Sequence, residues 1–169
     1  MTDKSKKTFL LTTILGSFLL YSLIYYAHVF KNAPYKFKEF KSFSIKYGTK
    51  DSMVNYYNSA TGEYTYLNKN DSLIKKHLYL NTSELDSLHK EASLFGFWDF
   101  PDNELNDDTT KPNHNNVPRY VIQFNYLRKS KTVQFDANYS GPAKLVDANR
   151  GLITKITDIL SAAEERQKE

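Results

Sequence analysis

Residues that could perform acid–base chemistry come close together in one segment of this chain. His114 follows Asp107 and Asp108 within a polar stretch, residues 101–117. A histidine within reach of a carboxylate is the arrangement of a general base and the group that orients it. One hypothesis is therefore a hydrolase with its site in the 101–117 loop, in which His114 is the base and either aspartate orients it.

Metal and cofactor chemistry find less support in the sequence. The chain has no cysteine, and no two of its histidines are four residues apart. The acidic run 99–108 offers oxygen ligands, but Asp107 stands where a calcium loop needs glycine, and Asn113 stands where it needs a bidentate glutamate. Phosphate-binding glycine loops and nucleophile-elbow motifs do not occur either. We predict no metal, no cofactor and no catalytic residue.

Aromatic residues suggest a contact surface instead. The 13 tyrosines and 11 phenylalanines are many for one small domain. Some of them must reach the surface, where aromatic patches mark partner contacts. Tyr56 and Tyr57 are neighbours on a predicted strand, so they point to opposite faces and one should be exposed. The predicted contact residues lie on one hairpin: Tyr56, Tyr57, Tyr64 and Tyr66. The alternative is an aromatic core, which we favour for Tyr120, Phe124 and Phe135.

These side chains are positioned by elements that the hydrophobic pattern predicts. Alternation of apolar and polar residues indicates strands at 43–47, 53–58, 63–67, 73–80, 120–126 and 133–135. Asn81 and Glu84 have the spacing of a capping box, and Gly96 is a suitable end for the helix that follows. A last helix follows Pro142, with a buried face of Leu145, Leu152, Ile156, Ile159 and Ala163. The order predicts an α+β domain at 42–163, with an antiparallel sheet of about five to six strands and two helices on one face.

An uncharged run, residues 9–30, precedes this domain. Its 22 residues would rise roughly 33 Å as a helix, enough to cross a hydrocarbon core of about 30 Å. A cleaved signal peptide is one alternative, but the run is longer than a signal core and lacks a good cleavage site. A buried core helix is another, but such helices rarely run this long without a charge. We predict a single-pass anchor with a cytoplasmic tail at 1–8, because Lys4, Lys6 and Lys7 oppose translocation of so short a tail.

Charge separates the two ends of the chain. Residues 1–50 carry a formal charge of +7 and residues 51–169 carry −3. The basic residues therefore flank the span, and we predict no nucleic-acid binding, which requires a basic domain face. In the linker 31–41, lysines alternate with aromatic residues, so this segment either lies on lipid headgroups or is a solvated connection. The lipid partner is predicted to contact residues 9–41, and 164–169 form a charged tail.

Two resemblances bear on these predictions. The FSIKY strand, the helix that ends in Gly-Phe-Trp-Asp-Phe, the 120–135 hairpin and the Gly-Pro-Ala-Lys-Leu segment resemble a small periplasmic domain family of unknown function in Gram-negative bacteria. The resemblance implies a fold rather than an activity, and this chain lacks a Gly-Gly-Cys-Pro-like opening. The tripeptides that begin at Asp51, Asp71, Asp86 and Asp108 resemble the Asp-Ser/Thr acceptor of a bacterial periplasmic O-glycosylation system. That resemblance implies modification at Ser52, Ser72 and Thr109, although Asp-Ser also starts turns and caps helices.

The leading interpretation is a membrane-anchored interaction or accessory domain without catalysis. The location it implies is the bacterial inner membrane, with the N-terminus in the cytoplasm and the domain in the periplasm. A protein partner is expected in addition to lipid.

Overall fold

The computed structural model describes residues 3–31, 34–49, 51–106 and 116–168 of the chain. It divides into two compact units, Met1–Tyr35 and Lys36–Glu169. The predicted hydrolase residues His114, Asp107 and Asp108 lie outside the described residues, as does Thr109.

The first unit is a single long helix, α1 (Asp3–Lys31). Within its span Asp3–Tyr26, an 18-residue window has a mean hydropathy of 1.7, and none of that window is buried. The hydroxyls of Thr12 and Thr13 bond to backbone carbonyls one turn earlier, so these polar groups are satisfied within the helix. By length and composition, α1 is therefore able to cross a membrane.

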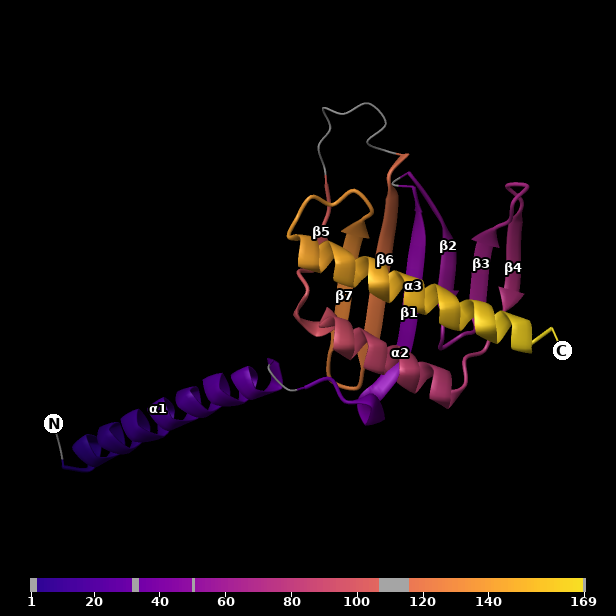
Figure 1. Ribbon diagram of the computed structural model, residues 1–169. Coiled ribbons are helices and arrows are strands. Elements are labelled where there is room, and N and C mark those ends of the chain that lie inside the picture. Colours follow the sequence, from indigo (N-terminus) through magenta and orange to yellow (C-terminus); the bar gives the residue numbers. More distant parts are fainter. Residues whose placement is uncertain (1–2, 32–33, 50, 107–115, 169) are drawn as a thin grey trace. The chain divides into compact units, whose positions relative to one another are not determined.

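The second unit is a seven-stranded, mostly antiparallel sheet with two helices on one face, which confirms the α+β class (Figure 1). The strand order is β4-β3-β2-β1-β6-β7-β5. The strands are β1 (Phe40–Thr49), β2 (Ser52–Asn58), β3 (Glu63–Leu67), β4 (Leu73–His77), β5 (Asn103–Glu104), β6 (Pro118–Tyr126) and β7 (Ser130–Asp136).

One strand was absent from the sequence prediction. β5 has only two residues, and it pairs in parallel with β7, where Glu104 lies opposite Phe135. Two residues show no alternation, so no local pattern identifies such a strand. The sheet therefore has seven strands, one more than the upper end of the predicted range, and the strand pair at its β5 edge is parallel.

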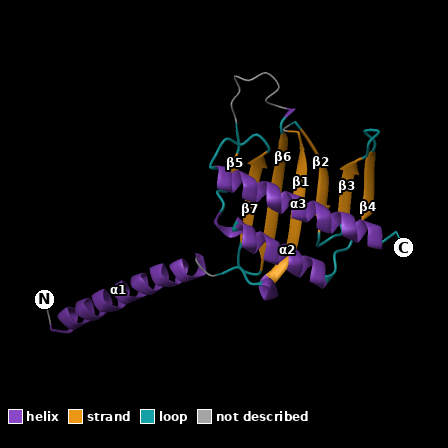
Figure 2. Ribbon diagram, viewed as in Figure 1, coloured by secondary structure: helices purple, strands orange, loops and turns teal. Residues whose placement is uncertain are grey.

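Two helices, α2 (Thr82–Phe95) and α3 (Ala143–Arg166), cover the same face of the sheet (Figure 2). At the start of α2 the Asn81 side chain accepts from the Glu84 N–H while Glu84 accepts from the Asn81 N–H, so the predicted capping box is present. Gly96 ends the helix with φ of 77°, a left-handed conformation that favours glycine. Short 3-10 turns, η1 (Phe37–Glu39) and η2 (Phe97–Asp99), precede β1 and follow α2.

The core lies between this face and the helices. The buried strand residues alternate as predicted and include Phe43, Ile45, Ile122, Phe124, Val133 and Phe135, all at most 2% exposed. The buried face of α3 is rotated slightly from the predicted one, because Val146 and Leu160 are buried where Leu145 and Ile159 are half-buried. This rotation brings Asn149, which is fully buried, into the helix–sheet interface.

Candidate functional site

The four hairpin tyrosines divide between the two faces of the sheet. Tyr57 lies opposite Ile45 and Tyr64, on the face that the helices cover. Tyr57 is 0% exposed, and burial raises the pKa of its phenol to about 12. Tyr56 lies opposite Lys46 and Thr65, on the uncovered face. Burial therefore removes Tyr57 from any contact surface, whereas Tyr56 remains available, half-buried, with its hydroxyl accepting from Asn58 Nδ2 at 2.9 Å.

Tyr64 and Tyr66 are also on the helix side, beside a partly buried ion pair. Lys76 Nζ lies 5.5 Å from the centre of the Tyr64 ring and 4.9 Å from that of Tyr66. The same ammonium donates to the Tyr66 hydroxyl at 3.3 Å and to the carboxylate of Glu164. Both rings thus hold a cation whose charge α3 neutralises, so the cation–π capacity of both rings and the acceptor of the Tyr66 hydroxyl are used within the domain.

The pKa values of this ion pair shift in the directions that a charged pair requires. Burial by itself would lower the pKa of Lys76, but hydrogen bonds to Glu164 and Tyr66 raise it above its ordinary value. Burial would likewise raise the pKa of Glu164, but the bond and charge of Lys76 hold it below its ordinary value. Both groups are therefore ionised at neutral pH.

A second glutamate at the other edge of the sheet lies in a different environment. Glu104, on β5, is 0% exposed, and its Oε2 accepts from Asn149 Nδ2 at 2.6 Å. The same amide nitrogen donates to the Leu145 carbonyl at 3.1 Å, so both of its N–H groups are used. Burial raises the pKa of Glu104 to about 7, against the smaller opposing effects of the Asn149 bond and the charge of Lys131.

Two oxygen atoms at this junction have no hydrogen-bond partner among the described residues: Glu104 Oε1 and Asn149 Oδ1. A buried acceptor without a donor costs free energy, on the order of 1–3 kcal/mol. A proton on Glu104 Oε1 converts that atom from an acceptor into a donor. The neutral acid is therefore suited to this position, because it carries no negative charge that burial would leave uncompensated.

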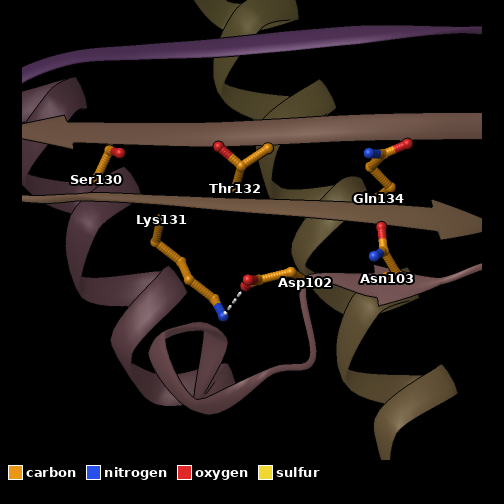
Figure 3. Close-up of a pocket in the computed structure, with 6 residues that line it drawn as sticks. All are labelled: Asp102, Asn103, Ser130, Lys131, Thr132 and Gln134. Carbon is orange, nitrogen blue, oxygen red and sulfur yellow. Dashed lines mark hydrogen bonds and ion pairs between the residues drawn. The ribbon is translucent and has the colours of Figure 1, made fainter.

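A polar pocket of about 370 Å³ lies at the β7–β5 edge (Figure 3). Lys131 Nζ donates to Asp102 Oδ1 at 2.7 Å and to the carbonyl of Phe100, so its charge is compensated. The remaining lining residues carry uncharged hydroxyl or amide groups: Asn103, Ser130, Thr132 and Gln134. The pocket offers hydrogen bonds but no uncompensated charge among its lining residues.

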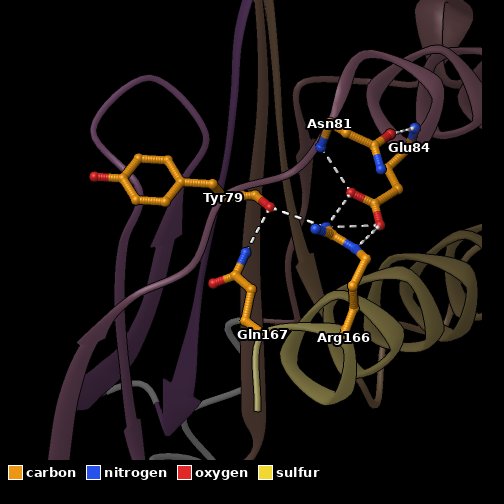
Figure 4. Close-up of polar contacts among 5 residues, drawn as sticks. All are labelled: Tyr79, Asn81, Glu84, Arg166 and Gln167. Atoms are coloured by element: carbon orange, nitrogen blue, oxygen red, sulfur yellow. Dashed lines mark hydrogen bonds and ion pairs between the residues drawn. The ribbon is translucent and has the colours of Figure 1, made fainter. Parts of the chain in front are cut away.

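The end of α3 is tied to the start of α2 by a polar cluster (Figure 4). Arg166 donates to both carboxylate oxygens of Glu84, at 2.9 and 2.8 Å, and to the Tyr79 carbonyl at 3.1 Å. Gln167 donates to the same carbonyl at 2.8 Å. Because Glu84 also caps α2, one carboxylate joins the two helices, and we assign this cluster a structural role.

A histidine of α2 is enclosed by aromatic rings. His89 Nδ1 lies 2.7 Å from the Tyr126 hydroxyl, and its ring packs near Phe37 and Trp98. Burial lowers the pKa of His89, so the neutral imidazole is favoured. The surroundings are those of a packed core histidine with one satisfied ring nitrogen.

Residues from both sides of the segment 107–115 meet at one carboxylate. Asp136 is nearly buried and accepts two bonds from Arg119, at 2.7 and 2.9 Å, and one from the Asn106 N–H at 3.0 Å. Asn106 and Arg119 flank the undescribed segment. The hydrolase site itself stays a prediction.

Within the described part of the chain, no group of three or more His, Asp and Glu residues is placed to hold a metal ion.

The candidate modification residues that the structure describes are on the surface. Ser52 begins β2 and Ser72 precedes β4, and both are exposed. The Ser72 N–H bonds to the Asn68 side chain at 3.0 Å, within a turn that Asp71 passes through with φ of 54°. Accessibility is compatible with modification, and the turn geometry accounts equally well for this Asp-Ser pair, so use of either serine stays a prediction.

No protein-family model matches this chain, and no curated protein matches it in sequence. The resemblance to a periplasmic domain family therefore stays a prediction.

Sequence reasoning missed both glutamate junctions, although part of the signal was present. Asn149 and Glu164 continue the apolar stripe of α3 at helical spacing from Leu152, Ile156 and Leu160. A polar residue in such a stripe indicates a buried partner. Their partners, Glu104 and Lys76, come from distant strands, and nothing in the local sequence identifies them.

Proposed function

We propose that this chain is a single-pass membrane protein whose α+β domain docks a protein partner through the uncovered face of its sheet. The membrane in this proposal is a bacterial inner membrane, with α1 as the anchor, the N-terminal lysines in the cytoplasm and the domain in the periplasm. Lipid contacts residues 9–41. The helix α1 supports the anchor by its length and composition, and Lys4, Lys6 and Lys7 support the orientation.

One observation carries the docking proposal: both helices lie on one face of the sheet, and no described element covers the other (Figure 1). Strand register places a continuous row across that face, Lys75, Thr65, Tyr56, Lys46, Val121 and Gln134. Tyrosine among polar side chains is the composition of a non-obligate interface. Tyr56, near the middle of the row, is the expected anchor.

Co-purification of the full chain from detergent-solubilised membranes tests this surface. We expect Tyr56→Ala to lose the partner, because a tyrosine hot spot is worth about 2 kcal/mol or more, or roughly 30-fold in affinity. Tyr79→Ala is the matched control, since Tyr79 is 59% exposed and lies outside the row. Recovery of the partner with Tyr56→Ala equal to that with Tyr79→Ala contradicts the proposal.

The same preparation separates docking from the hydrolase hypothesis. His114→Ala should leave the cellular phenotype of the protein intact, while Tyr56→Ala impairs it and leaves thermal unfolding nearly unchanged. Loss of phenotype at His114 with none at Tyr56 would favour the hydrolase, because loss of a general base costs about 10²–10⁴ in rate.

Orientation is tested by labelling, for which the absence of native cysteine is an advantage. With an impermeant thiol reagent on intact spheroplasts, Ser130→Cys should react and Ser5→Cys should not. The reverse pattern, or a mature N-terminus near Lys31, contradicts the proposed anchor.

A further inference from the structure

The second half of the linker, residues 36–41, packs against a turn of the domain that is distant in sequence. Arg128, in the β6–β7 turn, donates to both carboxylate oxygens of Glu39 in η1, at 3.2 and 2.7 Å. The Leu127 N–H donates to the Glu39 carbonyl at 2.9 Å. We call this surface, formed by residues 36–41 and the 127–129 turn, the linker end.

Positive charge is concentrated on the linker end. Lys36, Lys38 and Lys41 are exposed, and the Arg128 side chain is 48% exposed. Glu39 is the one acidic residue in the segments 34–41 and 126–131. Because residues 51–169 carry −3 overall, this surface differs in sign from the remainder of the domain.

Exposed apolar side chains accompany these cations. Leu127 is 62% exposed in the β6–β7 turn. Nearby, the ring of Phe37 lies 5.7 Å from that of His89 on α2, and His89 lines a surface hollow together with Lys90, Ser93 and Leu94. Leu94 is 80% exposed. A single exposed leucine is ordinary, but Leu127 directly adjoins the cations of the linker end, which makes that turn amphiphilic.

The length of the connecting chain limits how far this surface can lie from the end of α1. The helix ends at Lys31, and residues 32–36 span at most about 17 Å when fully extended. If α1 crosses a membrane, the linker end remains close to the headgroups, where each lysine or arginine is worth about 1 kcal/mol on an anionic leaflet.

We propose that the linker end binds the anionic lipid surface of the membrane that α1 crosses, with Lys36, Lys38, Lys41 and Arg128 over the headgroups and Leu127 in the interface. The inference rests on the proposed membrane anchor but not on the protein partner. It extends lipid contact from the linker to a turn more than 80 residues further along the chain, which Glu39 holds beside η1.

The test uses the full chain in nanodiscs with an environment-sensitive fluorophore on a single introduced cysteine. Leu127→Cys reports on the linker end, and Leu73→Cys, at a position 47% exposed on β4, is the matched control. We expect the probe at residue 127 to shift to shorter wavelength and to be quenched by spin-labelled lipid when the nanodisc contains phosphatidylglycerol. In discs of phosphatidylcholine alone, and at residue 73 in either disc, quenching should be several-fold weaker.

A charge-reversal variant tests the cause. Lys38→Glu combined with Lys41→Glu should reduce quenching at residue 127 to the level seen in phosphatidylcholine, without changing thermal unfolding. Equal quenching at residues 127 and 73, or quenching that does not depend on anionic lipid, overturns the lipid-binding proposal. If the chain still inserts into the disc in that case, the proposed membrane anchor is not contradicted. Failure of the chain to insert overturns both.

Discussion

Two glutamates join α3 to opposite edges of the sheet, and they respond to burial in opposite ways. Glu104 comes from the β5 edge and meets Asn149 in the first half of α3; Glu164 lies near the end of α3 and meets Lys76 at the β4 edge. Burial raises the pKa of Glu104 to about 7, whereas Lys76 holds the pKa of Glu164 below its ordinary value despite burial.

The two pKa values shift in opposite directions because the two carboxylates have different partners, and not only because they are buried to different extents. Lys76 presents a full charge to Glu164, but Asn149 offers Glu104 only a neutral N–H. The charge of Lys131 lowers the pKa of Glu104 less than burial raises it, and Lys131 is itself bound to Asp102 and the Phe100 carbonyl. Desolvation therefore prevails at one junction and ion pairing at the other.

The two junctions should make the stability of the protein depend on pH in opposite directions. The raised pKa of Glu104 means that the folded protein holds a proton that the unfolded chain loses, so stability falls as pH rises from about 4.5 to about 7. The lowered pKa of Glu164 contributes stability that is present above its unfolded value and is lost as pH falls through the folded value.

Removal of Asn149 should have the largest effect. Asn149→Ala leaves a fully buried carboxyl without its donor and opens a cavity, and we expect a loss of about 3 kcal/mol in the free energy of unfolding near neutral pH. Urea denaturation measures it. The loss should be smaller at about pH 5, where Glu104 is neutral. A loss of the same size at both pH values would contradict the raised pKa of Glu104 and its contrast with Glu164.

Glu104→Gln should stabilise the protein, by on the order of 2 kcal/mol at about pH 8. The amide has no charge to bury, and its N–H₂ group is a donor of the kind that Asn149 Oδ1 lacks. Variant and parent should converge as pH falls towards 4.5, where the parent is protonated as well. A variant less stable than the parent at pH 8 shows that the ionised form is the one the fold accommodates.

Glu164→Gln should do the opposite and destabilise by about 1 kcal/mol at neutral pH. The pair is partly exposed, with side-chain exposures of 29% for Lys76 and 20% for Glu164, so solvent screens part of the attraction. The difference from the parent should disappear below the folded pKa of Glu164. Lys76→Met with Glu164→Gln is the double variant that isolates the coupling between the two side chains.

Tyr66→Phe should have the smallest effect, about 0.5 kcal/mol. The substitution removes the hydroxyl that accepts from Lys76 at 3.3 Å but keeps the ring over which the ammonium lies. Thermal unfolding in parallel with Tyr66→Ala separates the two contributions, since only the alanine loses the ring. Equal losses in both variants would assign the whole effect to the hydroxyl.

Much of the fold could be predicted because its signals are local. Alternation identified the six longer strands, and the Asn81–Glu84 spacing with Gly96 identified α2. The candidate surface was harder, because alternation shows that Tyr56 and Tyr57 face opposite ways without showing which face the helices cover. Only the position of α2 and α3 decides that Tyr57 is buried.

The apolar helix α1 follows from the length of its uncharged run. The α+β class and the alternation that gives the sheet one apolar face follow from periods of 3.6 and 2 within short windows, so the sequence is sufficient for all three. Tertiary structure alone decided the two-residue strand β5 and the partners of α3. Glu104 meets Asn149 across 45 residues, and Lys76 meets Glu164 across 88. Such pairs depend on where α3 crosses the sheet, and that crossing is set by packing of the whole core rather than by any local pattern.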